Sequence, residues 1–294
     1  MSRIRLMLLT LVLASLAASP AWSARVTDGL LALYEFDEGS GSTVSDTSGA
    51  GTPLDLIINT TTAVTWQTGR LQVNTTTVIA SPGSADKIIQ ACRLSNSLTV
   101  EAWVNFTDLS LDGPARIVTL SADAIERNFT LGQQFDDYVF RLRTTTTDLN
   151  GRPNLVPAAG VETGLRHIVF TRESDGDTVF YLDGAPGDNF TRDGDFSNWA
   201  AGHRFALANE INGGRDWVGT YHLVAVYDRA LTSPEVAQNY AAGADPATPT
   251  PSRTPSSTAT GSPTVSPTFS STPSATPTST PSPTGSPTAT VSRA

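Results

Sequence analysis

The residues Leu-Ala-Leu-Tyr-Glu-Phe-Asp-Glu-Gly-Ser-Gly stand at positions 31–41, and Gly-Thr-Tyr-His-Leu-Val-Ala-Val-Tyr-Asp-Arg-Ala-Leu stand at positions 219–231. Both stretches are rich in aliphatic and aromatic side chains. In the first, the residues of positions 30–37 alternate between two faces, which is the period of a β-strand. The two stretches therefore predict strands at the beginning and at the end of the folded part of the chain.

The residues between these stretches carry the same signal. Positions 98–106 alternate Leu, Val, Ala, Val and Phe with Thr, Glu, Trp and Asn. Asp-Gly steps at 175–176 and 183–184 suit tight turns, because glycine tolerates a positive φ. Many short strands joined by turns predict an all-β fold, an antiparallel two-sheet sandwich. We expect further strands at residues 116–120, 138–144, 167–172, 178–182, 204–208 and 222–227.

One segment, residues 233–242, has the pattern of a helix. Thr232 or Ser233 can cap its first turn, Pro234 suits that turn, and Gly243 can end it. We expect this to be the single helix, short and near the C-terminal end of the folded domain.

The first 23 residues have the composition of a signal peptide. Arg3 and Arg5 precede an apolar run at residues 6–18, and Ala-Trp-Ser at 21–23 is a small-x-small cleavage site. The run is too short to cross a bilayer comfortably, although an uncleaved anchor is the alternative. We expect a mature chain without a membrane span, secreted or displayed on the surface of a bacterial cell.

The composition changes again at residue 244. Eleven of the nineteen prolines follow this point, among Thr, Ser and Ala, so the segment 244–294 has too little apolar surface to fold. We expect a disordered tail that serves as a spacer, or else an inert solvated end. The folded domain is then expected over residues 24–243.

The charge and cysteine content narrow the partners and the chemistry. The net charge is −9 at pH 7, and Lys87 is the one lysine. Phosphate backbones require clustered Lys and Arg, so this balance argues against nucleic acid as a partner. Cys92 is the one cysteine, so no intramolecular disulfide can form, and we expect it to be a small buried apolar residue.

Four stretches in order resemble the bacterial laminin-G-like domains of the concanavalin A-like lectin/glucanase superfamily. They are Tyr-Glu-Phe-Asp-Glu-Gly-Ser-Gly at 34–41 with Asp-Thr-Ser-Gly at 46–49, Leu-Thr-Val-Glu-Ala-Trp-Val at 98–104, Arg-His-Ile-Val-Phe at 166–170 with Tyr-Leu-Asp-Gly at 181–184, and residues 219–240. The resemblance implies a jelly roll of two antiparallel sheets. It also implies a non-catalytic extracellular module that binds a glycan or a surface protein.

The same superfamily contains glucanases, so a glycoside hydrolase or lyase is the alternative function. A retaining glycosidase needs two carboxylates about 5 Å apart. The nearest match is Glu-Phe-Asp-Glu at 35–38, in which Glu35 and Asp37 share a face but Glu38 points to the other side. We expect no catalytic residue. A structural surface protein without a specific ligand is the third possibility.

Members of this family often carry one calcium ion. Asp37 and Asp46 are the residues we expect to supply carboxylates to such a Ca²⁺ site, together with backbone carbonyls near 49–51. The alternative is an ordinary acidic loop whose Asp residues make turn hydrogen bonds. Many relatives have an acidic residue early in the final strand where this chain has His222, which weakens the case for calcium.

Glycan-binding sites usually contain an aromatic platform. Trp66, Trp199 and Trp217 lie in or beside predicted loops and are our candidates for ligand binding, the alternative being that they pack in the core. We assign Trp103, in a clear strand, to packing. The sequence predicts no ligand more specific than an extracellular glycan or a surface protein.

Overall fold

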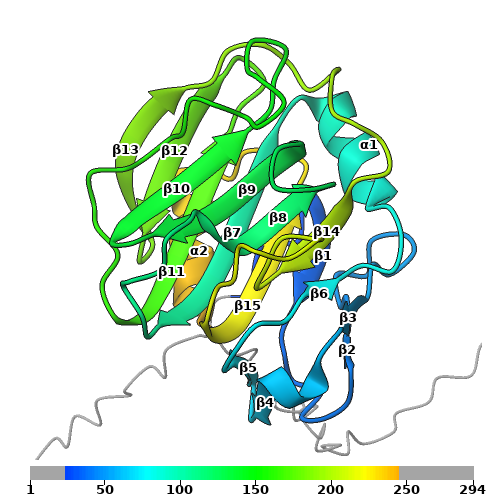
Figure 1. Ribbon diagram of the computed structural model, residues 1–294. Helices are drawn as coiled ribbons and strands as arrows, with labels where there is room; N and C mark the ends of the chain where they lie inside the picture. Colours follow the sequence, from blue (N-terminus) through cyan, green and yellow to red (C-terminus); the bar gives the residue numbers. More distant parts are fainter. Residues whose placement is uncertain (1–23, 245–294) are drawn as a thin grey trace, which may run out of the picture. The chain divides into compact units, whose positions relative to one another are not determined.

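The β-strands of the chain form two antiparallel sheets that pack face to face (Figure 1). The computed structural model describes residues 24–244. Sheet A has the order β13 (Ala185–Thr191), β12 (Asp177–Leu182), β11 (Gly164–Arg172), β7 (Leu98–Phe106), β15 (Gly219–Tyr227), β5 (Arg70–Val73) and β4 (Val64–Gln67), with β1 (Leu30–Tyr34) also paired to β15.

Sheet B faces sheet A across the core. Its order is β10 (Asp137–Leu142), β9 (Arg127–Gln134), β8 (Ala115–Ser121), β14 (Arg204–Leu207), β6 (Ile79–Ala80), β3 (Leu56–Ile58) and β2 (Thr43–Val44). A short 3₁₀ helix, η1 (Thr61–Ala63), precedes β4, and two α-helices complete the fold: α1 (Asp86–Ser95) and α2 (Ser233–Ala242).

The two stretches that decide the fold are neighbours in sheet A. β1 pairs with β15, with Leu33 opposite Ala225, and β15 pairs on its other side with β7. Between the sheets lies an aromatic core in which Phe140 of sheet B stacks on Phe170 of sheet A at 4.5 Å between ring centroids. The predicted antiparallel sandwich is thus confirmed.

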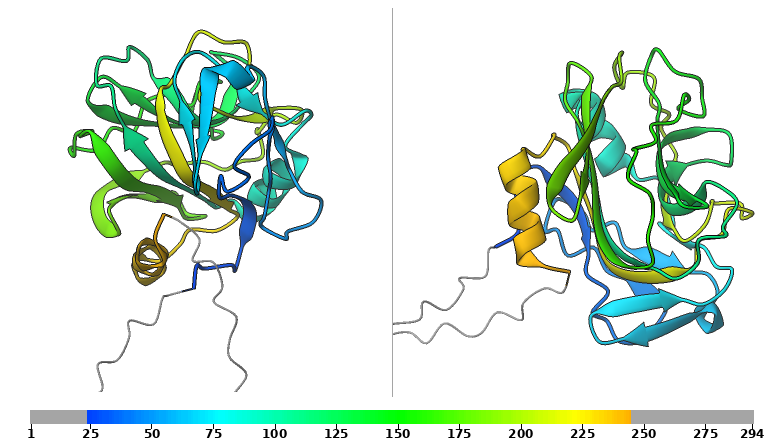
Figure 2. Two further views of the ribbon diagram at one scale, coloured as in Figure 1. Left: turned by 90° about the horizontal axis from the view of Figure 1, so that it is seen from below. Right: turned by 90° about the vertical axis from the view of Figure 1, so that its left-hand side faces the viewer.

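The outer faces of the two sheets differ. Helix α2 covers the outer face of sheet A, so that helix, sheet A and sheet B form successive layers (Figure 2). Tyr240 of α2 stacks on Trp103 of β7 at 5.3 Å, and Val236 joins the same apolar cluster. Helix α1 instead places Ile88, Ile89 and Cys92 in the central core. Among residues 24–244, no helix lies over the outer face of sheet B (Figure 1).

The strands expected from alternation are present, and so is α2, whose N-terminus carries the capping box of Thr232 and Glu235. The expectation of one helix was wrong, because α1 is a second one. Its buried residues 88, 89 and 92 have helical spacing, a signal present in the sequence. Strands β9 and β13 were missed because each has one β-branched residue, and β2 to β6 were missed because two to four residues are too few to show alternation. The predicted signal peptide and tail lie outside the described residues.

A buried carboxylate holds the outer layer to sheet A. Glu101, in the middle of β7, is fully buried and accepts hydrogen bonds from His167 Nε2 at 3.0 Å and from Asn239 Nδ2 of α2 at 2.7 Å. Arg25, in the segment before β1, forms an ion pair with the same carboxylate. One charge therefore joins two strands, the helix and the N-terminal segment.

The environment of Glu101 determines its pKa. Burial alone would raise the pKa of this carboxyl, but the charge of Arg25 and the hydrogen bond from His167 lower it from 4.5 to about 2. Because the pKa is lower in the folded protein, the ionised carboxylate stabilises the fold fully above its ordinary pKa. This stabilisation is lost as the pH falls from about 4.5 towards 2.

We predict that Glu101→Gln lowers the free energy of unfolding at pH 7 by about 3 kcal/mol, because it leaves the buried Arg25 without its charge partner. Urea denaturation between pH 7 and pH 3 measures this, and the variant should lose less stability than the wild type on acidification. Glu162→Gln, at an exposed ion pair with Arg166, is the control and should cost less than about 1 kcal/mol. Equal losses for the two variants would contradict the prediction.

Candidate functional site

The outer face of sheet B is lined by polar side chains because of strand alternation. In β9, Phe129 and Leu131 point into the core, so Thr130 points outward. In β10, Phe140 and Leu142 point inward and Arg141 outward, directly opposite Thr130. Beneath its covering loops, the face therefore carries hydroxyl and guanidinium groups together with the apolar Val139.

A β-bulge brings a second arginine to this face. The register between β8 and β9 shifts after Arg116, so that Ile117 and Val118 both join the core. Arg116 is thereby directed outward. Its Nε donates to Glu210 Oε2 at 2.9 Å, and both side chains are fully buried.

Arg127, at the start of β9, completes a group that we call the arginine cluster: Arg116, Arg127 and Arg141. Arg127 Nη1 donates to Thr130 Oγ1 at 3.0 Å and lies 3.7 Å from Glu210 Oε2. Arg141 donates to the side-chain oxygens of Asn154 and Asn150 at 2.8 and 3.0 Å. Burial and the charges of Arg116 and Arg141 lower the pKa of Arg127 to about 9.

Two more basic side chains lie close to one carboxylate beside the arginine cluster. Arg143 Nη1 is 3.3 Å from Glu126 Oε1, and His203 Nε2 is 3.9 Å from the same oxygen. Burial lowers the pKa of His203, although the Glu126 carboxylate opposes the shift. With the arginine cluster, these residues gather charged side chains at the outer face of sheet B and in the segments that flank its strands, and this group is our candidate site.

Asp46 is located in the loop after β2, as the sequence suggested, but its contacts are within the protein. Oδ1 accepts from the backbone N–H groups of Leu33 and Ser48 at 3.1 and 3.0 Å, and Oδ2 accepts from that of Leu54 at 2.9 Å. The ammonium of Lys87, on α1, forms an ion pair with Oδ2 and donates to the carbonyl of Ala50 at 3.0 Å.

Lys87 therefore occupies the position expected for the cation. Its partners are Asp46 and a carbonyl within residues 49–51, the ligands predicted for calcium. Asp37 is exposed, and within residues 24–244 no group of three His, Cys, Asp or Glu side chains is placed to hold a metal ion. Calcium binding by Asp37 and Asp46 stays a prediction, and these contacts favour the alternative of a loop closed by hydrogen bonds.

The three candidate tryptophans have different environments. Trp199 and Trp217 are 2% and 0% exposed, and Trp217 Nε1 donates to Gln133 inside the core. A ring without accessible surface cannot stack on a ligand, so for these two residues the structure corrects the expectation in favour of packing. Trp66 is half-buried on the edge strand β4, where its Nε1 donates to the Gly41 carbonyl at 3.0 Å.

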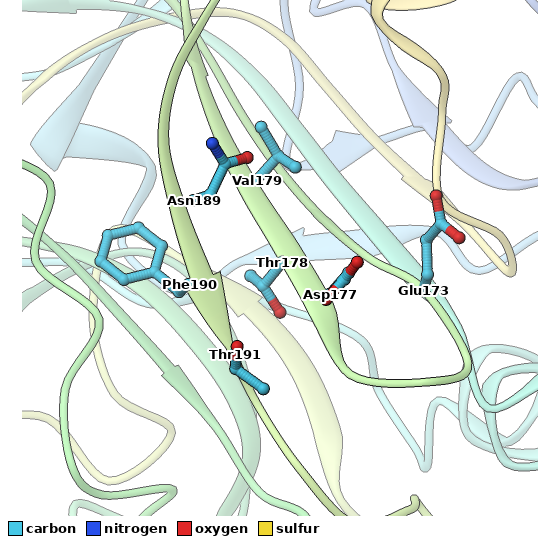
Figure 3. A pocket seen from close by; sticks show the side chains of 7 residues that line it. All are labelled: Glu173, Asp177, Thr178, Val179, Asn189, Phe190 and Thr191. Atoms are coloured by element: carbon cyan, nitrogen blue, oxygen red, sulfur yellow. The ribbon is translucent and has the colours of Figure 1, made fainter.

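A shallow recess of about 280 Å³ lies at the other edge of sheet A, between β12 and β13. Glu173 and Asp177 stand on either side of the turn that joins β11 to β12, and Asn189 and Thr191 come from β13 (Figure 3). The charged side chains in its lining are the carboxylates of Glu173 and Asp177. The recess is a polar surface open to solvent rather than an enclosed pocket.

The sequence of this chain matches the model of a known protein family. A model of the Laminin_G_3 family, described as the concanavalin A-like lectin/glucanases superfamily, matches residues 73–237. The chain belongs to this family. The matched region runs from the end of β5 into α2 and so includes every residue of the arginine cluster. No characterised protein matched the sequence significantly.

Solved structures from the superfamily share the fold at low sequence identity. A domain of the extracellular arabinanase AbnA from Geobacillus stearothermophilus is 19% identical with a TM-score of 0.52, over 72% of this chain and 98% of that domain. A Trypanosoma rangeli sialidase is 15% identical with a TM-score of 0.54, over 76% and 36% of the two chains. The binding domain of botulinum neurotoxin DC is 9% identical with a TM-score of 0.52, over 73% and 51%.

The chain thus matches about half of the neurotoxin domain and about a third of the sialidase. At these identities the likeness shows the fold alone. Over residues 24–244, no helix has the length and apolarity to cross a membrane.

For this member of the superfamily, we predict that Lys87→Met lowers the free energy of unfolding by about 1–3 kcal/mol, because Asp46 loses its cation in a buried site. The melting temperature of the wild type should be equal in calcium and in chelator. Thermal unfolding measures both effects. Arg93→Met, an exposed charge on the same helix, is the control and should change stability little. A wild-type melting temperature that rises with calcium would contradict this account.

Proposed function

We propose that the chain is an exported, non-catalytic recognition module that binds a glycan or a surface protein through the outer face of sheet B and its bordering loops. One observation carries the proposal. Helix α2 covers the outer face of sheet A, whereas the outer face of sheet B has polar side chains under irregular segments such as 148–154. Ligand recognition by loops and polar side chains on a rigid sheet is a common arrangement.

The carboxylates of this face support a non-catalytic role. A glycosidase needs one carboxyl that can give up a proton and a second that is free to attack. Glu210 Oε2 is bound by Arg116, and Oε1 accepts from Ser121 and from the Ile211 N–H at 3.1 Å. Glu126 is paired with Arg143. Both carboxylates are therefore occupied by contacts with arginines.

The structural neighbours are consistent with recognition of either class of ligand. The AbnA domain was solved in complex with arabinotriose, and the neurotoxin binding domain in complex with rat synaptotagmin II. One superfamily fold therefore accommodates both a glycan and a protein. Trp66 stays a candidate aromatic platform of this chain, because part of its ring is accessible at the edge of sheet A.

We predict that the purified full-length chain binds members of a combined glycan and extracellular-protein array, equally with and without chelator. It should release no reducing ends from those glycans. Trp66→Ala tests the platform and should weaken glycan binding several-fold if this ring stacks on the sugar. Trp199→Phe, in the core, is the matched control.

The alternatives predict different results from the same experiment. Release of sugar would favour the hydrolase or lyase. A blank array, on both glycans and proteins, would favour a structural surface protein and contradict the proposal.

A further inference from the structure

The arginine cluster contains more positive charge than its contacts neutralise. Both oxygens of Glu210 are in use, and this one carboxylate lies between Arg116 and Arg127. The partners of Arg141 are the neutral amides of Asn150 and Asn154. Two of the three guanidinium groups therefore share the one contacting carboxylate, and the third contacts none, in a place from which water is largely excluded.

More distant charges do not restore the balance. Arg152 and Arg215 lie close enough to lower the pKa of Arg141 further, and Asp148 opposes them. The negative charge of Asp123 likewise acts to raise the pKa of Arg127. Unpaired buried charge is costly, and a protein usually pairs it or shifts its protonation. The carbonyls of Pro114 and Ala124 accept from Arg116 and Arg127 but carry no net charge, and an arginine side chain scarcely loses its proton, so a counter-anion would complete the neutralisation of the cluster.

Two donors of the cluster have no protein acceptor. Arg116 Nη2 and Arg127 Nε are buried, and neither has a hydrogen-bond partner among the described residues. Arg116 and Arg127 are both 0% exposed, and both lie beside Glu210 Oε2. Unused guanidinium N–H groups fit the oxygens of a carboxylate or sulfate, to which they can donate in pairs.

We infer that the arginine cluster is an anion-binding site that receives a carboxylate or sulfate group of an acidic sugar. The inference rests on the proposed function, because it names the class of glycan that the module takes. The segment 148–154 covers Arg141 through Asn150 and Asn154 while its residues Asp148, Leu149, Arg152 and Pro153 are exposed, so an anion must displace this segment to reach the buried cluster. An anion that replaces the amide oxygens of Asn150 and Asn154 at Arg141 gains a charge-assisted bond there.

The test titrates the full-length protein with D-glucuronate, D-glucose 6-sulfate and D-glucose at constant ionic strength. The readouts are calorimetry and the NMR resonances of the arginine Nε–H groups. We expect both acidic sugars to shift the Arg127 resonance saturably and glucose to leave it unchanged. A response to one acidic sugar alone identifies the group as carboxylate or as sulfate.

Arg141→Gln should weaken binding of the acidic sugars at least tenfold, about 1.4 kcal/mol, and Arg141→Lys should weaken it less. Arg166→Gln makes the same charge change at a distant exposed ion pair and should leave the affinity unchanged. The inference is overturned if neither acidic sugar gives a saturable shift, if glucose acts equally, or if the Gln variants at positions 141 and 166 lose the same affinity.

The titration of the wild-type protein does not depend on the folding of any variant. Its outcome can also be distinguished from the outcome of the array experiment. If the array shows binding to neutral glycans alone, the proposed anion site is wrong and the proposed function stands. A saturable response to acidic sugars with an array blank for both glycans and proteins would keep the anion site and remove the proposed function.

Discussion

The buried carboxylate of Glu101 is the constraint on which the outer layer of the molecule depends. β7 is the central strand of sheet A, and Glu101 projects from it on the side away from sheet B, where an apolar residue would be expected. The charge is affordable only because Arg25, His167 and Asn239 converge on it. Those three residues come from distant parts of the chain, so the N-terminal segment and α2 must both be docked for the network to be complete.

In this arrangement the outer face of sheet A contributes to stability, and the outer face of sheet B is left for recognition. Once α2 and the N-terminal segment cover the centre of sheet A, that part of its outer face has no room for a ligand. Sheet B has the opposite character, because within residues 24–244 no helix covers its outer face and loop segments cover its polar side chains instead. Arg25, which docks on sheet A, has a carboxylate partner in Glu101, whereas one carboxylate contacts two of the three guanidinium groups of the arginine cluster on sheet B. The charge imbalance of the cluster therefore lies beneath loops rather than beneath a helix.

The sequence predicted the fold better than the site, and particular residues show why. Alternation located the nine-residue strands β7 and β15, because a buried face imposes a period of two. Strand β9, with Arg-Asn-Phe-Thr-Leu-Gly-Gln-Gln, was missed because its polar residues suggested a loop. Trp199 and Trp217 could not be placed from local pattern. The arginine cluster was invisible, because positions 116, 127 and 141 meet only through strand pairing and a bulge.

Lysine and arginine differ as cations. This difference explains why the site of Lys87 and Asp46 is complete, whereas the arginine cluster can still accept an anion. Lys87 is a compact point charge on a flexible stem, and it satisfies Asp46 and one carbonyl much as a small metal ion would. The Asp46 carboxylate thus has its counter-cation within the protein. A guanidinium has five N–H donors fixed in a plane. Backbone carbonyls of Asn96, Arg192 and Gly194 accept from those of Arg172 on β11. Arg116 Nη2 and Arg127 Nε, in contrast, have no acceptor among the described residues, and oxygens of a carboxylate or sulfate can accept from such donors.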